Sequence, residues 1–157
     1  MPNLKTVHIR PAHRYDSELF ERLRRDPECK KYLKGCQRIQ PGDHGVWFLY
    51  KTTGDDTRLY TICLPDGKGI GYVLGERDMS RRYTISICLG PGCRWQGAGG
   101  VALRAVLKEL GDFPFLAEIH KEDLAGTRLF ESAGFTKVKV GKMFDVFTLD
   151  KEGRERE

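Results

Sequence analysis

A glycine-rich stretch in the second half of the chain has the composition of a phosphate-binding loop. Gly90–Gly100 reads Gly-Pro-Gly-Cys-Arg-Trp-Gln-Gly-Ala-Gly-Gly and lies between a strand pattern that ends at Leu89 and a helical pattern that begins near Ala98. Glycine is costly at the start of a helix unless the backbone must approach another group closely or adopt a positive φ angle. Such a turn presents successive N–H groups at the positive end of the helix dipole, where a pyrophosphate binds well. Because Arg94 stands among the glycines and an orderly helix follows, we expect a phosphate site and not a merely flexible loop.

Two other phosphate motifs fit this loop less well. Gly97–Ala102 matches the G-x-G-x-x-A pattern of dinucleotide-binding proteins. That pattern should directly follow the first strand of a parallel array, whereas seven residues separate Leu89 from Gly97 here and the preceding strands have a hairpin pattern. The Gly-Lys-Ser/Thr of a P-loop is also absent from the loop. The sequence therefore favours neither a dinucleotide-binding unit nor a P-loop.

The elements around the loop are predicted from the spacing of apolar residues. Alternation and turn residues predict strands at Thr6–Arg10, Leu59–Leu64, Gly69–Leu74, Tyr83–Leu89, Phe115–Ile119, Thr136–Val140 and Met143–Leu149. Helical spacing predicts helices after a possible Asp16 cap, after Pro27, over 98–110 up to Gly111, and over 125–133 up to Gly134. Residues 35–54, with the aromatic cluster at 47–50, fit no single pattern.

Length and composition predict one domain. The chain has 157 residues, and we expect a single domain over 1–150 followed by a disordered tail at 151–157. No apolar run approaches the ~20 residues that cross a bilayer, and the first residues lack the apolar centre of a secretory signal. We therefore expect a cytoplasmic protein without a membrane partner.

Charge and cysteine content bear on partners and metals. The 27 basic and 22 acidic residues are interleaved and give a net charge of +5, a pattern typical of a solvated surface, so nucleic acid is not the expected partner. The five cysteines include no C-x-x-C pair, and the four histidines lack the spacing of metal ligands. We expect reduced thiols and no metal site.

Two segments together resemble the signatures of the GNAT superfamily of N-acetyltransferases. Arg94–Gly99 is similar to the Q/R-x-x-G-x-G/A signature, and Glu122–Phe135 is similar to E-N-x-x-S followed by a short helix and Gly-Phe. Either segment alone is a moderate signal, but both occur here at the right separation and in the right order of elements. With the first helices and the hairpin around Gly69–Gly71, the resemblance covers nearly the whole chain.

The resemblance implies an α/β fold of the α+β type, with a mixed, mostly antiparallel central sheet, helices on both faces and a splayed central strand pair. It implies acetyl-coenzyme A as the cosubstrate, bound through backbone groups of the late strand and through the glycine loop. The residues so implied are Ile87, Cys88, Leu89, Arg94, Trp95, Gln96, Gly97, Ala98, Gly99 and Gly100, together with Asp123 in the second signature. A backbone N–H near Leu89 would polarise the thioester oxygen.

The chain departs from the family pattern at three positions. Phe130 stands where the family commonly has a tyrosine that protonates the departing thiolate. Asp123 replaces the usual asparagine, and Gly126 replaces the usual serine. A thiolate is a tolerable leaving group near neutral pH, so these changes leave the identity of a general acid open.

Glu118 and His120 are the candidates for a catalytic base. They alternate along one predicted strand, so both point to the same face, near the expected position of the thioester. A charged side chain within the apolar strand Phe115–Ile119 is unusual unless it has a function, which favours Glu118 as the base. The alternative for His120 is a surface histidine at a strand end. Cys88 and Cys93 are expected to be packing residues, because direct transfer needs no thiol nucleophile.

The front half contains loose motifs that resemble the GNAT branch that acetylates nucleotide-linked deoxysugars. Trp47 could stack on a sugar or base, and Arg24, Arg25 or Arg38 could hold the diphosphate; the alternative is that Trp47 belongs to the core. The sequence thus predicts an acetyl-coenzyme A-dependent N-acetyltransferase, monomeric or homodimeric, for a small-molecule amine that the motifs suggest is nucleotide-linked. Two alternatives stay open: acetylation of a protein N-terminus or lysine, and a non-catalytic module that binds acetyl-coenzyme A.

Overall fold

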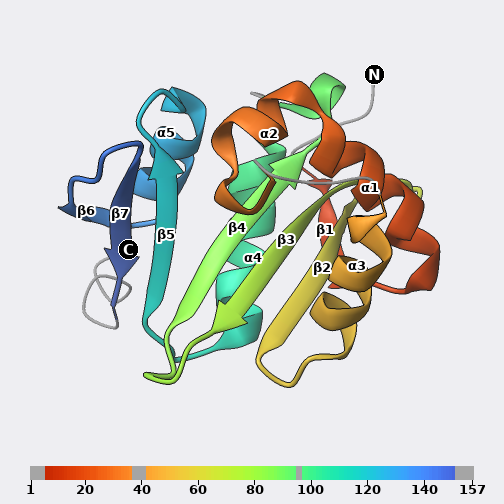
Figure 1. Ribbon diagram of the computed structural model, residues 1–157, viewed down its shortest axis with the longest axis horizontal. Helices are drawn as coiled ribbons and strands as arrows, with labels where there is room; N and C mark the ends of the chain where they lie inside the picture. Colours follow the sequence, from red (N-terminus) through yellow and green to blue (C-terminus); the bar gives the residue numbers. More distant parts are fainter. Residues whose placement is uncertain (1–5, 37–41, 95–96, 151–157) are drawn as a thin grey trace.

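The computed structural model describes residues 6–36, 42–94 and 97–150, and its strands form one mixed sheet (Figure 1). In spatial order the strands are β1 (His8–Pro11), β2 (Thr57–Cys63), β3 (Gly69–Arg77), β4 (Tyr83–Leu89), β5 (Phe115–His120), β7 (Phe144–Leu149) and β6 (Thr136–Lys139). Neighbouring strands run antiparallel, apart from β4 and β5, which run parallel. The expected mixed, mostly antiparallel sheet is confirmed.

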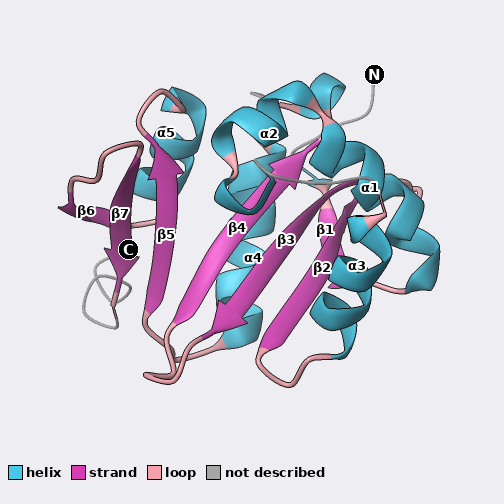
Figure 2. Cartoon of the chain, viewed as in Figure 1, coloured by secondary structure: helices cyan, strands magenta, loops and turns pink. Residues whose placement is uncertain are grey.

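Helices cover both faces of the sheet, as expected (Figure 2). One face carries α1 (Ser17–Arg25), α2 (Pro27–Tyr32) and α3 (Asp43–Thr53), and the other carries α4 (Ala98–Leu110) and α5 (Leu124–Ser132). Alternation along β3 sends Val73 into the core under α4, and Tyr72 and Leu74 into the core under α1 and α3. Ile70 also enters the core under α4, because the pairing of β2 with β3 shifts between Ile62 and Cys63 and breaks the alternation beside it. None of the described helices is long and apolar enough to cross a membrane.

The predicted splay of the central strands is confirmed by their register. Among the described residues, β4 and β5 pair at Tyr83 with Phe115 and at Thr84 with Leu116, and no pair follows. Beyond this point β4 continues beside β3 up to Leu89, and β5 continues beside β7. The second half of β4 therefore presents backbone groups to a gap in the sheet, where they can bind a ligand.

Helix α3 lies in the segment whose pattern was ambiguous. Phe48 is buried, but Leu49 and Tyr50 on the same helix are exposed, so the aromatic cluster has no clean helical stripe. The predicted cap at Asp16 was wrong in its detail. Asp16 precedes α1, but its carboxylate caps no N–H of that helix and instead accepts hydrogen bonds from Arg10 and Thr61.

Candidate functional site

Two adjoining cavities open where β4 and β5 diverge. The loop cavity, about 420 Å³, lies among the glycine loop, α2 and the start of α5. The strand cavity, about 400 Å³, lies among β3, β4, β5 and the N-terminal helices. Both volumes fall within the range of small-ligand sites, roughly 300–1,000 Å³. The two cavities share the lining residues Tyr32, Leu33, Ile87, Asp123 and Gly126.

The glycine loop forms one wall of the loop cavity through the start of α4. Gly97 caps this helix with a φ angle of 90°, a left-handed conformation that favours glycine. The N–H groups of the first helical turn, which includes Gly99 and Gly100, have no acceptor within the helix, so they are available to an anion. Gly97, Gly99 and Gly100 all line the cavity, as predicted for a phosphate site.

The other predicted residues of the loop differ in their positions. Ala98 is fully buried and supports the first turn from below. Gly99 is buried close to Leu129, and a Cβ atom at Gly99 would lie 3.3 Å from that side chain. A larger residue at 99 would therefore disturb the packing of α4 against α5 as well as any ligand. Trp95 and Gln96 lie outside the described residues.

Arg94 lines the loop cavity, but its side chain forms ion pairs with two carboxylates at the start of α2. Its Nη2 lies 2.6 Å from Oδ2 of Asp26, and its Nη1 lies 2.6 Å from Oε2 of Glu28. Burial opposes the charge of this guanidinium, but the two carboxylates outweigh it and raise the pKa of Arg94. Arg94 thus anchors α2 to the loop, and an anion in this cavity would meet an arginine whose charge is already paired.

Three predicted residues on β4 occupy the edge of the gap. Ile87 lines both cavities, and Cys88 and Leu89 line the loop cavity. The Cys88 thiol itself is buried, and the neighbouring Cys29 thiol and burial raise its pKa well above the usual range. Cys88 is therefore a neutral packing residue, which agrees with the role expected from the sequence.

Asp123 stands at the junction of the two cavities. One carboxylate oxygen, Oδ1, accepts a hydrogen bond from the N–H of Gly126 at 2.9 Å and so caps α5. Burial raises the pKa of this carboxyl, and the capping hydrogen bond offsets only part of that effect. Phe130 from the same helix is buried and lines the strand cavity, where it offers no proton.

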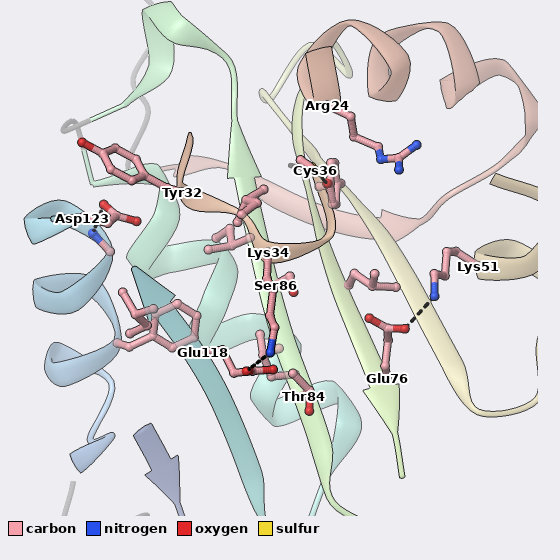
Figure 3. A pocket seen from close by; sticks show the side chains of 18 of the residues that line it. Arg24, Tyr32, Lys34, Cys36, Lys51, Glu76, Thr84, Ser86, Glu118 and Asp123 are labelled. Atoms are coloured by element: carbon pink, nitrogen blue, oxygen red, sulfur yellow. Dashed lines mark hydrogen bonds and ion pairs between the residues drawn. The ribbon is translucent and has the colours of Figure 1, made fainter. Parts of the chain in front are cut away.

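The strand cavity contains two ion pairs that join lysines of the N-terminal helical segments to glutamates of the strands (Figure 3). Lys34, in the short helical turn Lys34–Cys36, lies 2.6 Å from Glu118 on β5, and Lys51 on α3 lies 2.6 Å from Glu76 on β3. Glu118 therefore lines the cavity, as its prediction as a base requires. Its carboxylate is held by a lysine that the sequence gave no reason to place there.

His120 does not share the position of Glu118, although both lie on the same strand. Among the described residues it lines neither cavity. Its Nδ1 accepts a hydrogen bond from the N–H of Glu122 at 3.1 Å, and its ring packs against Tyr32 and Phe144. These contacts support a packing role for His120.

Arg24 and Trp47, the predicted substrate-binding residues, lie together on the wall of the strand cavity. The guanidinium carbon of Arg24 lies 3.9 Å from the centroid of the Trp47 ring, so the indole already carries a stacked cation. Nη1 of Arg24 lies 3.1 Å from Nδ1 of His44. Trp47 is thus half-buried support for Arg24, and not the exposed stacking platform expected from the sequence. Arg38 lies outside the described residues.

Several residues of the site were missed by sequence reasoning. Tyr32 ends α2 and Lys34 follows it, in a charged stretch whose pattern resembles a solvated surface, so no sequence signal marked either residue. Glu76 was findable in principle, because the alternation of β3 continues past Leu74 and puts Tyr72, Leu74 and Glu76 on one face. No group of three or more His, Cys, Asp or Glu side chains suited to a metal ion occurs within the described ranges.

Comparison with known families gives one match to this chain. Residues 6–136 match the model of the family described as "Acetyltransferase (GNAT) domain". No curated protein sequence matches the chain.

Solved structures with the same fold cover nearly the whole chain. Spermidine N-acetyltransferase from Vibrio cholerae, solved with CoA and spermine, is 16% identical, with a TM-score of 0.76 over 90% of this chain and 92% of that one. Aminoglycoside acetyltransferase AAC(6')-Ib, solved with coenzyme A and kanamycin, is 15% identical, with a TM-score of 0.80 over 96% of this chain and 98% of that one. A domain from Methanocaldococcus jannaschii is 22% identical, with a TM-score of 0.79 over 92% and 97% of the two chains.

Proposed function

The chain belongs to the acetyltransferase (GNAT) domain family, and from this premise we propose that it transfers an acetyl group to a primary amine held in the strand cavity, with acetyl-coenzyme A in the loop cavity. The observation that carries the proposal is the junction of the two cavities at the splay of β4 and β5. Two ligands that react with each other must bind in adjoining sites, and the loop cavity and the strand cavity adjoin at this junction.

The lining of the loop cavity supports the placement of coenzyme A there. Its wall combines the N-terminus of α4, with the glycines at 97, 99 and 100 that keep the backbone accessible, and the free edge of β4. The first turn of α4 suits a pyrophosphate, and the edge of β4 suits an amide-bearing arm. When bound, acetyl-coenzyme A supplies the acetyl group as a thioester that an unprotonated amine can attack directly.

Glu118 is the proposed base for the acceptor. A primary amine arrives largely as an ammonium ion, and a carboxylate in the cavity wall can bind this ion and take a proton from it. Lys34 occupies the same carboxylate at 2.6 Å. The incoming ammonium therefore has to displace Lys34, which costs little because an exposed ion pair of this kind contributes about 0–1 kcal/mol.

Tyr32 is the proposed proton donor at the junction. Phe130 stands where the family commonly has its tyrosine, so that position supplies no proton. Tyr32 and Asp123 line both cavities, and each carries a group that can hold a proton. Asp123 is engaged in capping α5, which leaves Tyr32 as the better placed group for a proton that passes between the cavities.

The class of amine is the finer part of the proposal. Two similar structures were solved with spermine and kanamycin, which are small amines, and a cavity of about 400 Å³ suits a molecule of that kind. The nucleotide-linked aminosugar suggested by the front-half motifs remains our proposal for the acceptor. Acetylation of a protein N-terminus or lysine remains the alternative.

The experiment is release of free coenzyme A thiol, followed with a panel of polyamines, aminoglycosides, amino acids, free and nucleotide-linked aminosugars, and lysine peptides. We expect thiol release that depends on the amine, together with an acetylated product of matching mass. Release with peptides alone would favour the protein-directed alternative. Binding of acetyl-coenzyme A without release in any arm would favour the non-catalytic module.

A further inference from the structure

The strand cavity is bounded on one side by a buried positive charge for which the described residues show no carboxylate partner. Arg24 is only 4% exposed. Its side-chain polar contacts are with the His44 ring and the Cys36 thiol, and its Nε atom is buried with no hydrogen-bond partner among the described residues. Burying an unpaired charge and an unsatisfied donor is unfavourable, so a guanidinium in this state needs an explanation in terms of what it binds.

Acidic side chains on the neighbouring helices and in the cavity have partners other than Arg24. On the helices, Glu21 pairs with Arg25 and Glu28 pairs with Arg94. In the cavity, each carboxylate also has a partner: Lys51 for Glu76, Lys34 for Glu118 and the Gly126 N–H for Asp123. Arg24 is the cation of this wall that the described part of the chain leaves without a counter-ion.

The surroundings of Arg24 hold it in place without neutralising it. Nε2 of His44 lies 2.8 Å from the carbonyl oxygen of Ser17 and donates to it, so Nδ1 is free to accept from Arg24. Burial lowers the pKa of His44, and Arg24 lowers it further, so the imidazole is neutral. Trp47 supports the guanidinium from its face. A neutral acceptor and an indole fix the orientation of the charge and leave the charge itself uncompensated.

We infer that the acceptor is an amine that also carries an anionic group, a carboxylate or a phosphate, and that this group pairs with Arg24. This inference rests on the proposed function, because it assigns the strand cavity to the acceptor. Glu118 and Arg24 lie on opposite sides of the cavity, with Lys34 and Ser86 between them (Figure 3). The amine end binds toward Glu118 and the anionic end toward Arg24, so the cavity selects molecules that hold both charges.

The test compares twin ligands that differ only in the anion. Amino acids are paired with their decarboxylated amines, and glucosamine 6-phosphate is paired with glucosamine, so the two arms separate a carboxylate from a phosphate source. Calorimetric binding to the full chain is measured alongside thiol release. A charge-assisted hydrogen bond to a buried guanidinium predicts that the anionic twin of at least one pair binds roughly 10–100-fold more tightly than its neutral partner.

Arg24→Gln should abolish this preference for the anionic ligand. Arg24→Lys should keep the charge but weaken the preference, because lysine lacks the planar guanidinium that donates two parallel hydrogen bonds and stacks on Trp47. Arg25→Gln is the matched control, since Arg25 is exposed, lines neither cavity and pairs with Glu21. Circular dichroism checks the folding of each variant, and Arg24→Lys serves as the test if Arg24→Gln does not fold.

The inference would be overturned by twins that bind wild-type protein equally well in every pair, or by a folded Arg24 variant that keeps the full preference. These outcomes differ from a failure of the proposed function. Equal acetylation of both twins leaves the proposed function standing and removes the inference. Tight binding of an anionic twin that is never acetylated would leave the anion site at Arg24 standing and remove the proposed function.

Discussion

The Nζ atom of Lys34 lies 2.6 Å from Oε2 of Glu118, although the two residues are 84 positions apart in the sequence. This pair links the turn after α2 to β5 across the strand cavity. It places a primary ammonium group against the carboxylate proposed to receive the ammonium of the acceptor. The contact with Lys34 therefore indicates that the Glu118 carboxylate can bind a primary ammonium group.

Glu118→Gln should lower the turnover number while leaving cofactor affinity within about twofold, because losing a positioned base typically costs ~10²–10⁴-fold in rate. The turnover number comes from thiol release and the affinity from calorimetry. Glu76→Gln removes the other lysine-paired carboxylate of the same cavity and is the control. An equal loss in both variants would mean that cavity charge, and not proton removal by Glu118, limits the rate.

Tyr32→Phe should lower the turnover number by on the order of 10²-fold if the phenol donates a proton at the junction of the cavities. Its ring packing against His120 is kept, so stability should change little. Asp123→Asn, measured in parallel, reports on the other proton-bearing group that lines both cavities. Wild-type rates in Tyr32→Phe across the whole pH range would remove Tyr32 from the mechanism.

Gly100→Asp should weaken acetyl-coenzyme A binding by on the order of tenfold or more, because it puts a negative charge beside the proposed pyrophosphate site. The same substitution should not destabilise the fold, since an acidic side chain suits the first turn of a helix. There is also room for it, because a Cβ atom at this position would meet only the end of the Arg104 side chain, at 3.4 Å.

Gly100→Asn is the neutral twin of that variant and controls for side-chain size. Calorimetry gives the affinities, and thermal unfolding gives the stability. Equal affinities in the aspartate and asparagine variants would count against the placement of phosphates at the start of α4. Gly99 is less suited to this test, because a larger residue there would also press on Leu129.

Asp16 should make folding stability fall at acidic pH. Burial opposes ionisation of its carboxyl, but hydrogen bonds from Arg10, His13 and Thr61 outweigh burial and lower the pKa to about 2. A pKa lowered by folding gives stability that is complete above the usual value of 3.8 and is lost as the pH falls through about 2.

Asp16→Asn should therefore lower the free energy of unfolding by about 1.5–3 kcal/mol near neutral pH, and this difference should shrink below about pH 4. Denaturant titrations at a series of pH values measure it, with the exposed Asp112→Asn as control. A difference between wild type and Asp16→Asn that stays constant down to pH 2 would show that the carboxylate charge is not what stabilises this site.

The sequence predicted the sheet and the loop because both have short-range signals. Alternation identified β4 with its two faces, and the glycines before α4 indicated a helix start that presents N–H groups. Helix α3 was not predicted, because its apolar residues split between core and surface, with Phe48 buried and Leu49 and Tyr50 exposed. Burial in this segment depends on tertiary contacts that no local pattern contains.

The candidate site was predictable where one segment carries it, and not where distant segments meet. Glu118 could be suspected from its own strand. Its partner Lys34 could not, because the pair forms only when the turn after α2 folds over β5. The state of Arg24 was equally hidden, since its lack of a counter-ion follows from which acids Arg25 and Arg94 take.

We propose that the chain joins an acetyl-coenzyme A site to an amine site at the splay of β4 and β5. The decisive measurement is release of coenzyme A thiol by the wild-type chain across the amine panel, with the mass of each acceptor measured before and after. We expect thiol and N-acetylated amine in equal amounts for at least one small amine, and less of both in Gly100→Asp when acetyl-coenzyme A is below saturation. Tight binding of acetyl-coenzyme A with no thiol released for any amine would contradict it.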